Sequence, residues 1–199
     1  MIYGRPLGAV LWGTFLRITL VHHATFLINS LCHYKGRRTY DDSSTARDSW
    51  FVSWFTFGEG YHNYHHKFQW DYRNGIRWYD FDPSKWIIKF LSVFNIAYNL
   101  RTASNSSILK AKIETLLAKI NLISIAKINN SYTNQINMIK NNAFKKIKLL
   151  KALELKYNSS IKNKKKLNYY LNKKKLYTLE IEHSISSLLL LFMNLKNLS

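Results

Sequence analysis

GAVLWGTFLRITLVHHATFLINSLC, residues 8–32, is a long apolar run and the strongest indication of fold class in the chain. A helix rises about 1.5 Å per residue, so this run can cross the roughly 30 Å hydrocarbon core of a bilayer. Polar side chains interrupt it: Arg17, His22, His23, Thr25, Asn29 and Ser30. Ionisable groups at membrane depth normally face a protein interior or a polar cavity. We therefore predict one membrane-spanning helix whose polar side packs against protein.

Basic residues at one end of this run predict its orientation. Lys35, Arg37 and Arg38 follow the apolar residues closely. Positive charge accumulates on the cytoplasmic side of spanning helices, so we expect this end of the helix to lie in the cytoplasm. Met1 would then lie on the opposite side of the membrane, and the polar residues after the run would be cytoplasmic.

The composition of the chain changes near residue 104. Residues 1–104 hold every Trp, Gly, Arg and Pro, six of the seven His and the one Cys, and their 12 basic and 7 acidic side chains give +5. Residues 105–199 hold 18 Lys, 4 Glu and many Asn and Ile, so they account for +14 of the net charge of +19. We predict a folded part, 1–104, and a lysine-rich tail, 105–199, that is helical or disordered. A single Cys excludes a disulfide framework and a CxxC zinc site.

The isoelectric point near 10 would ordinarily suggest a nucleic acid partner. Here the charge is carried by Lys in a segment without Arg or Gly, so we expect no nucleic acid partner. Helical periodicity is patchy around 108–127 and 138–157, while the lysine runs 164–166 and 173–175 are typical of solvated or disordered sequence. The last apolar stretch, 188–193, is too short to span a membrane.

Three further segments complete the first part of the chain. Residues 34–48 are polar and predict a loop with a turn. Residues 49–57, SWFVSWFTF, predict a short helix beside the membrane, with Trp50 and Trp54 at the interface. Residues 84–99 follow an Asp-Pro start signal and have apolar residues at helical spacing, which favours an amphipathic surface helix over a second span.

Three histidines stand close together in Gly58–His66, which reads GEGYHNYHH. His62, His65 and His66 are at positions i, i+3 and i+4, so on a helix their imidazoles project from one face. Neutral imidazole binds iron, zinc and copper, and three on one face can ligate one metal ion or be shared by two. We therefore predict a metal site here, whereas an isolated histidine such as His183 is typically structural.

A second polar element lies at the end of the apolar run. Asn29 and His33 are at i and i+4, so both point the same way, toward the side where the histidines of residues 62–66 would dock. This spacing alone fits a structural pair as well as a ligand pair. For His22 and His23, higher in the helix, we favour a structural role, hydrogen bonding inside a bundle or lining a cavity.

Several short motifs occur together in residues 4–104: Phe15-Leu16-Arg17, Thr25 to His33, Gly58 to His66, Asp71-Tyr72-Arg73 and Trp78. In combination they resemble the C-terminal half of membrane acyl-CoA desaturases of the stearoyl-CoA delta-9 type. GEGYHNYHH is specific among membrane di-iron proteins, because alkane hydroxylases and sterol-type enzymes carry different histidine motifs. The sequence DYRNGIRWYDFDPSKW resembles the bacterial branch of the family.

The resemblance implies an all-α membrane protein with part of the histidine-box desaturase fold. One helix would span the membrane, His-rich helices would lie on the cytoplasmic side and one helix would lie at the interface. We expect an integral membrane protein located in the bacterial inner membrane.

The resemblance also implies an oxidoreductase that introduces a cis double bond into a saturated fatty acyl chain during unsaturated fatty acid biosynthesis. Its di-iron centre uses O2, because no protein side chain can attack an unactivated C–H bond. The implied partners are a fatty acyl-CoA, O2, an external electron donor of the ferredoxin or cytochrome type, and membrane lipid.

The roles of individual residues follow from the same resemblance. His62, His65 and His66 would be the third histidine box, His33 an additional iron ligand, and Asn29 would hold a metal-bound water. At position 26 this sequence has Phe where many relatives have a Trp near the substrate, which implies contact between Phe26 and the acyl chain.

Two earlier histidine motifs of the family, HxxxxH and HxxHH, do not occur before His33 in this sequence. We therefore expect residues 1–104 to be the C-terminal portion of a desaturase, a fragment that is inactive alone. Two alternatives remain: a related membrane di-iron hydroxylase, and a basic membrane-attached binding protein whose lysine tail meets anionic lipid or nucleic acid.

Overall fold

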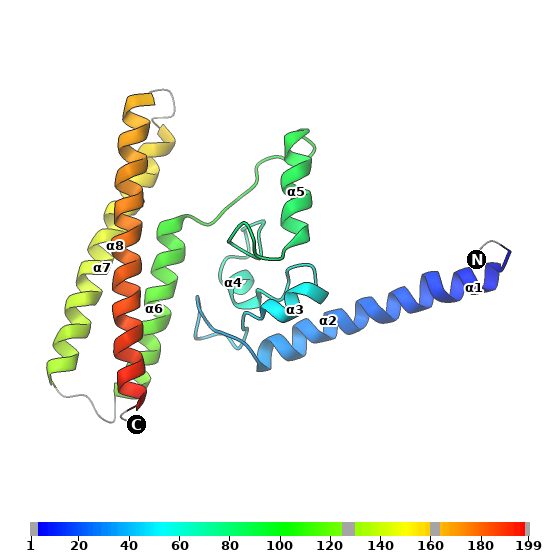
Figure 1. The fold of residues 1–199 in the computed structure, drawn as a ribbon, viewed down its shortest axis with the longest axis horizontal. Helices are drawn as coiled ribbons and strands as arrows, with labels where there is room; N and C mark the ends of the chain where they lie inside the picture. Colours follow the sequence, from blue (N-terminus) through cyan, green and yellow to red (C-terminus); the bar gives the residue numbers. More distant parts are fainter. Residues whose placement is uncertain (1–3, 125–129, 160–163, 198–199) are drawn as a thin grey trace. The chain divides into compact units, whose positions relative to one another are not determined.

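A computed structural model describes residues 4–124, 130–159 and 164–197, and within these ranges the chain is helical with no strands. The elements in order are α1 (Pro6–Val10), the π-helical turn η1 (Leu11–Leu16), α2 (Arg17–Tyr34), α3 (Trp50–Phe55), α4 (His62–Lys67), α5 (Pro83–Val93), α6 (Asn105–Ser124), α7 (Asn130–Ser159) and α8 (Lys164–Asn197) (Figure 1). The predicted all-α class is confirmed.

The chain divides into two compact units. Unit 1 comprises Met1–Arg38 and Ser44–Thr102, and it contains every histidine of the predicted metal site. Unit 2 comprises Thr39–Ser43 and Ala103–Ser199.

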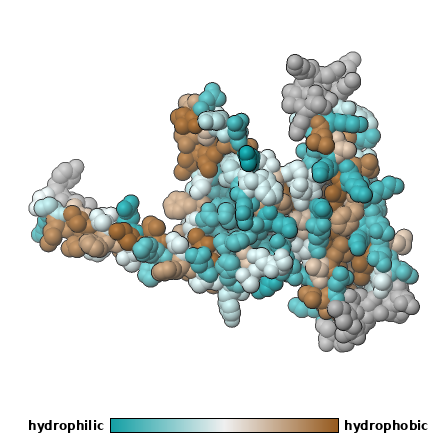
Figure 2. Space-filling view, turned by 180° about the vertical axis from the view of Figure 1, so that it is seen from behind, coloured by the Kyte–Doolittle hydropathy of each residue, from teal (hydrophilic) through white to brown (hydrophobic). Residues whose placement is uncertain are grey.

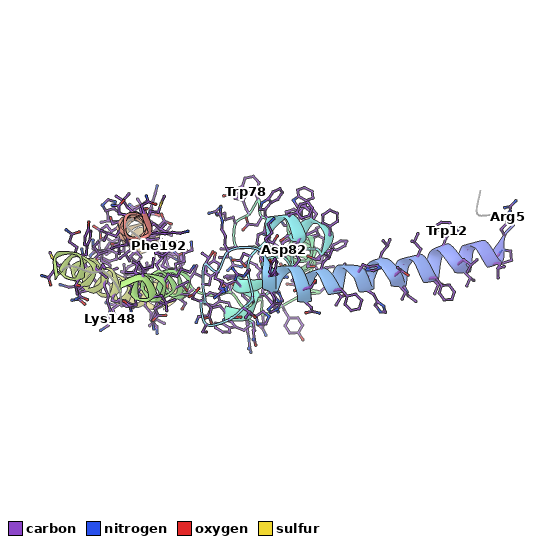
Figure 3. All side chains as sticks on the ribbon, turned by 90° about the horizontal axis from the view of Figure 1, so that it is seen from below. Arg5, Trp12, Trp78, Asp82, Lys148 and Phe192 are labelled. Carbon is purple, nitrogen blue, oxygen red and sulfur yellow. The ribbon has the colours of Figure 1, made fainter. Side chains whose placement is uncertain are left out.

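In unit 1, α1, η1 and α2 run as one helix from Pro6 to Tyr34 that is long and apolar enough to cross a membrane. Most of its large apolar side chains are exposed, among them Trp12, which is 70% exposed and projects from the helix (Figure 3). Among the described residues of α2, Cys32 alone is buried. Apolar surface of this extent needs lipid or other helices against it. These features agree with the predicted spanning helix.

The short helix α3 is capped by Ser49, whose hydroxyl accepts a hydrogen bond from the Val52 amide at 3.4 Å. Trp50 and Trp54 are exposed, and the ring of Trp54 stacks on Phe81 with centroids 4.0 Å apart. The helix and its exposed tryptophans match the prediction, while their placement at a membrane interface stays a prediction.

Helix α5 has a strong cap at each end. Asp82 is the N-cap, and its carboxylate accepts a first-turn backbone N–H at 2.9 Å. At the other end Asn95 has a left-handed backbone with φ of 57°, and two amides after the helix bond back to its last turn at 3.3 and 3.1 Å. The helix therefore stops at Val93, and the prediction of a helix to residue 99 was wrong. The outer face of α5 carries a hydrophobic patch (Figure 2) made by Trp86, Ile87, Phe90, Val93 and Phe94.

Unit 2 is a bundle of α6, α7 and α8, which lie side by side in Figure 1. Its core is aliphatic: Leu109, Ile113, Ile120, Ile136, Ala143, Ile147, Leu150, Ile181, Leu188 and Leu195. The helices predicted around 108–127 and 138–157 are present as α6 and α7, although residues 125–127 lie outside the described ranges.

Helix α8 differs from the prediction in two ways. The run Lys173–Lys175 lies within the helix, where Lys173 donates to the Tyr169 hydroxyl at 2.6 Å and Lys174 lies 3.8 Å from Glu154. The stretch 188–193 is not a short isolated element, since the residues before it continue the helix. Leu167–Asn197 is therefore a second helix long and apolar enough to cross a membrane, although some of its apolar residues pack into the bundle core.

Candidate metal centre

The last turn of α2 and helix α4 bring three histidines together in unit 1. The Nε2 atom of His62 lies 3.1 Å from Nε2 of His33 and 3.1 Å from Nε2 of His66. The ligating nitrogens of all three side chains lie within 4.8 Å of one another. Residues 29 positions apart in sequence thus present their nitrogens to one point.

Hydrogen bonds among the three rings cannot satisfy all of the converging ring nitrogens. A neutral imidazole has one N–H and one lone pair, so Nε2 of His62 either donates or accepts, yet it faces two neighbours at equal distance. A cation at the meeting point accepts a lone pair from each ring at once, and imidazole suits iron, zinc and copper. The donor set therefore fits a metal ion.

Burial favours the neutral form of His62 and His66. The pKa of His62 is lowered to about 4, first by burial and then by the neighbouring His66, His33 and His65. The pKa of His66 is also lowered, by burial and by its histidine neighbours. Both side chains are therefore in the neutral form that binds metal at pH 7. Within the described ranges, the buried Nδ1 of His62 has no hydrogen-bond partner.

His65 does not join this group. Its ring centroid lies 6.2 Å from that of His62 and 6.0 Å from that of His66. At 3.6 residues per turn, i+4 lies about 40° to one side of position i and i+3 about 60° to the other. Helix α2 meets the His66 side, so His65 lies apart from the three converging rings, and its role as a metal ligand stays a prediction.

The other two predicted residues lie on α2. Asn29 is exposed one turn before His33, on the same side of the helix. Phe26 is 63% exposed, and its ring lies 6.3 Å from His22 and 6.4 Å from His23. Their proposed contacts with a metal-bound water and an acyl chain stay predictions.

The loop before α3 fastens the two histidine-bearing helices together. The Arg47 amide donates to the Cys32 carbonyl at 2.7 Å, next to His33. The Asn63 side chain, next to His62, donates to the Ala46 carbonyl at 2.9 Å. Each anchor is adjacent to a histidine, so the loop fixes how the rings approach each other.

Asp48, in the same loop, accepts a hydrogen bond from the Tyr64 amide at 3.0 Å. Burial is the main cause that raises the pKa of this carboxyl to about 6, with a smaller contribution from the charge of Asp80. Asp48 therefore anchors the backbone of α4 at Tyr64. The pKa of its carboxyl lies close to the physiological range.

The glycines of the GEG motif have a steric explanation. A Cβ at Gly60 would collide with the backbone nitrogen of Ser53 and the carbonyl of Ser49. Gly58 has φ of 102°, and a Cβ there would lie 2.7 Å from the Asp82 carboxylate. Only glycine lets the chain turn tightly into α4.

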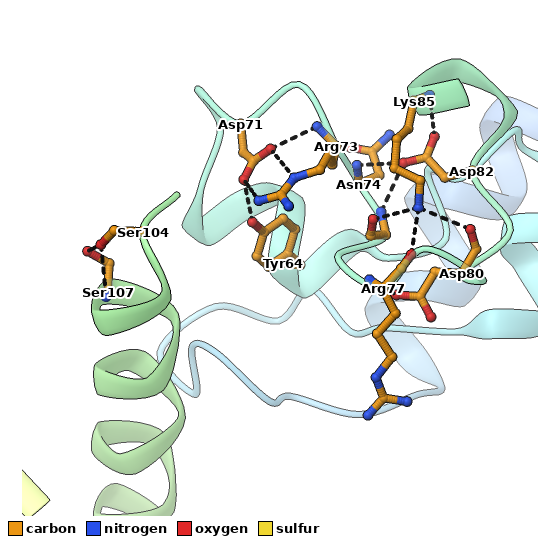
Figure 4. Close-up of polar contacts among 11 residues, drawn as sticks. Tyr64, Asp71, Arg73, Asn74, Arg77, Asp80, Asp82, Lys85, Ser104 and Ser107 are labelled. Atoms are coloured by element: carbon orange, nitrogen blue, oxygen red, sulfur yellow. Dashed lines mark hydrogen bonds and ion pairs between the residues drawn. The ribbon is translucent and has the colours of Figure 1, made fainter. Parts of the chain in front are cut away.

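A second acidic residue, the buried Asp71, also contacts α4. Asp71 accepts from the Tyr64 hydroxyl at 2.6 Å and pairs with the Arg73 guanidinium at 2.8 and 3.0 Å (Figure 4). These contacts give a physical role to Asp71 and Arg73 of the Asp-Tyr-Arg motif.

Asp82 and Lys85 hold the loop that follows. The Asp82 carboxylate accepts from the amides of Asn74 and Gly75 at 2.8 and 3.0 Å (Figure 4). The Lys85 ammonium donates to three backbone carbonyls of this loop at 2.8 to 3.2 Å. The Asn74 side chain in turn donates to Glu59 at 2.7 Å, which ties the loop to the GEG motif.

Sequence reasoning missed Thr45. Its hydroxyl oxygen lies 2.8 Å from Nδ1 of His33, the ring nitrogen that faces away from the other histidines. A threonine in a polar loop, 12 residues from the histidine it contacts, carries no sequence signal for such a contact.

Comparison with known proteins decides the family of the N-terminal part of the chain. Residues 1–98 match the family model described as fatty acid desaturase. Residues 1–98 belong to the fatty acid desaturase family. The desaturase segment thus includes α1 to α5 and all three converging histidines.

Individual relatives are desaturases from yeasts and a plant. The chain is 46% identical over 123 residues to "Acyl-CoA desaturase 1" of Saccharomyces cerevisiae, covering 62% of this chain and 24% of the relative. It is 43% identical over 114 residues to "Probable acyl-CoA desaturase" of Schizosaccharomyces pombe, covering 57% and 24%. It is 39% identical over 106 residues to "Delta-9 acyl-lipid desaturase 1" of Arabidopsis thaliana, covering 53% and 35%. The chain therefore spans about a quarter to a third of the length of these relatives.

Proposed function

We propose that the desaturase segment supplies part of the metal centre of an acyl desaturase, an oxidoreductase that introduces a cis double bond into a saturated fatty acyl chain. The observation that carries this proposal is the convergence of His33, His62 and His66 from two helices. The family of residues 1–98 adds the reaction class.

Iron is the metal we propose, held by His33, His62 and His66, with His65 and a water on Asn29 adding to the ligand set. When bound, iron supplies the O2 chemistry needed to break unactivated C–H bonds. The residues of this chain hold the ligating nitrogens in position, and burial lowers the pKa of His62 and of His66. The buried contacts around Tyr64 and Asp71 keep α4 rigid while they do so.

The proposed substrate is a fatty acyl chain, carried on CoA or on a lipid, with O2 and an external ferredoxin or cytochrome as the source of two electrons. The relatives include proteins named as acyl-CoA desaturases and as acyl-lipid desaturases. In this proposal the exposed apolar side of Pro6–Tyr34, including Phe26, forms one wall of an acyl tunnel whose remaining walls lie outside this segment.

We infer that the isolated chain is inactive. Three converging imidazoles provide ligands for one metal ion, whereas a di-iron centre needs more donors than these. The C-terminal position of the segment within a longer enzyme, expected from its motifs, is part of the same proposal. The relatives above come from yeasts and a plant, so the bacterial branch and the bacterial inner membrane stay predictions.

A chimera tests the proposed function. Residues 1–98 would replace the aligned segment of acyl-CoA desaturase 1 of Saccharomyces cerevisiae, in cells without other desaturase activity. We expect cis-unsaturated fatty acids in gas chromatography of the cell lipids, and a loss of at least about tenfold on His62→Ala. Lys89→Ala, an exposed change in α5, is the matched control. Hydroxylated product would contradict the desaturase assignment, and so would absence of product from a chimera that reaches the membrane and binds iron.

A further inference from the structure

Thr45 and His62 lie on opposite sides of the His33 ring. The Thr45 hydroxyl oxygen is 2.8 Å from Nδ1, while Nε2 is 3.1 Å from Nε2 of His62. A neutral imidazole carries a single ring proton, so the partner at one nitrogen decides whether the other has a free lone pair. An acceptor at Nδ1 leaves Nε2 free for a metal ion.

We propose that Thr45 is a positioning residue for His33. Its hydroxyl accepts the Nδ1–H of His33 and so holds Nε2 as a lone-pair donor toward the point shared with His62 and His66. The consequence for metal binding rests on the proposed function, whereas the proton position on His33 does not.

The residues beside Thr45 hold it in place. The Ala46 amide donates to the Ser44 hydroxyl at 3.1 Å, which closes a turn around Thr45. The Ala46 carbonyl accepts from the Asn63 side chain of α4, and the Arg47 amide donates to the carbonyl of Cys32 in α2. Thr45 therefore stands in a loop that is fastened to the neighbours of both His33 and His62.

His33 and His62 are oriented by different means. Nδ1 of His62 is buried and has no hydrogen-bond partner among the described residues, so packing orients that ring. His33 is less buried and has Thr45 as an outer partner. Loss of the Thr45 hydroxyl therefore acts on His33 and leaves the packing of His62 intact.

The size of the effect follows from the exposure of Thr45. Outer partners of metal-binding histidines typically account for 10- to 100-fold in metal affinity. Because Thr45 is exposed, water can replace part of its hydrogen bond. We expect a loss of about three- to tenfold when the hydroxyl is replaced by a methyl group.

The test uses the full chain in lipid nanodiscs, with Co2+ alone as the metal probe. Long-range proton–nitrogen NMR of 15N-histidine protein without metal reports which ring nitrogen of His33 is protonated, and His33→Ala assigns the signal. Optical titration gives the Co2+ affinity of Thr45→Val, of Thr45→Ser, which keeps the hydroxyl, and of Thr133→Val, an exposed control in α7.

The proposal predicts that the unchanged chain and Thr45→Ser carry the proton on Nδ1 of His33. Thr45→Val is expected to shift it toward Nε2 and to weaken Co2+ binding about three- to tenfold, while Thr133→Val has no effect. A proton on Nε2 in the unchanged chain overturns the proposal, as does a change of less than threefold in Thr45→Val. If the unchanged chain binds no Co2+, the proposed metal function fails, and the NMR result decides this proposal alone.

Discussion

His62, in the histidine cluster, and Asp48, in the loop that anchors α4, both have pKa values shifted by burial. Both are largely shielded from water, and their pKa values move in opposite directions, to about 4 for His62 and about 6 for Asp48. A His with a lowered pKa contributes stability that is present above pH 6.5 and is lost as pH falls to 4. An Asp with a raised pKa contributes stability that is present below pH 4 and is lost as pH rises through 6. The two effects oppose each other between about pH 4 and 6.

Asp48→Asn should separate the two effects. Asn keeps an acceptor for the Tyr64 amide but carries no charge, so it removes the cost of a buried carboxylate. We expect unit 1 of the variant to be more stable than that of the unchanged chain at pH 7, by on the order of 2 kcal/mol, with the difference vanishing near pH 4. Thermal unfolding followed by tryptophan fluorescence measures this, because every Trp lies in residues 1–104. A variant that is less stable at pH 7 would contradict this assignment of charge.

At the level of elements, the entry into α4 depends on one glycine. Gly60 is surrounded by the backbone of Ser49 and Ser53, which cannot move aside as a flexible side chain could. The turn leads into α4, which carries His62 and His66 to His33. Strain at this turn would therefore displace His62 and His66 relative to His33.

Gly60→Ala is expected to destabilise unit 1 by about 2 kcal/mol or more and to lower its metal affinity, because the added methyl group displaces backbone. Gly13→Ala is the matched control, since a Cβ at that position meets no atom within 4 Å. Melting temperatures from tryptophan fluorescence compare the two variants. Equal melting temperatures would show that the turn is not constrained as described.

In unit 2, α7 offers a matched pair of leucines. Leu150 is fully buried in the bundle core, whereas Leu155 is 66% exposed on the same helix. Leu150→Ala should destabilise the bundle by about 2–5 kcal/mol, and Leu155→Ala by less than about 0.5 kcal/mol. Thermal unfolding followed by circular dichroism tests this, and similar losses for both variants would argue against the bundle.

For the whole molecule, the sequence predicted the features that depend on local pattern. The apolar run 8–32 predicted most of the helix Pro6–Tyr34, and the spacing of His62 and His66 predicted one helical face. The end of α5, set by the left-handed Asn95, was missed because it depends on backbone geometry that the apolar spacing does not encode. The lysine content of α8 obscured its helix, because the apolar residues that pack it into the bundle core, such as Ile181 and Leu188, are widely spaced among polar ones.

The histidine cluster was predicted only in part for the same reason. The spacing of Asn29 and His33 left their role open, and only the fold brings His33 to 3.1 Å from His62. Thr45 could not be found at all, because a single loop hydroxyl has no distinguishing pattern in sequence. The sequence therefore supplied the ligand types, while the fold selected which of them meet.

Co2+ titration of the full chain in nanodiscs, followed by its visible absorption, tests the central claim that His33, His62 and His66 form one metal site. We expect the unchanged chain to bind one Co2+ with imidazole ligation, His62→Ala to bind at least about tenfold more weakly, and His183→Ala to bind like the unchanged chain. His183 is the matched control because it lies in unit 2, outside the cluster. Equal Co2+ affinities of His62→Ala and the unchanged chain would contradict the account.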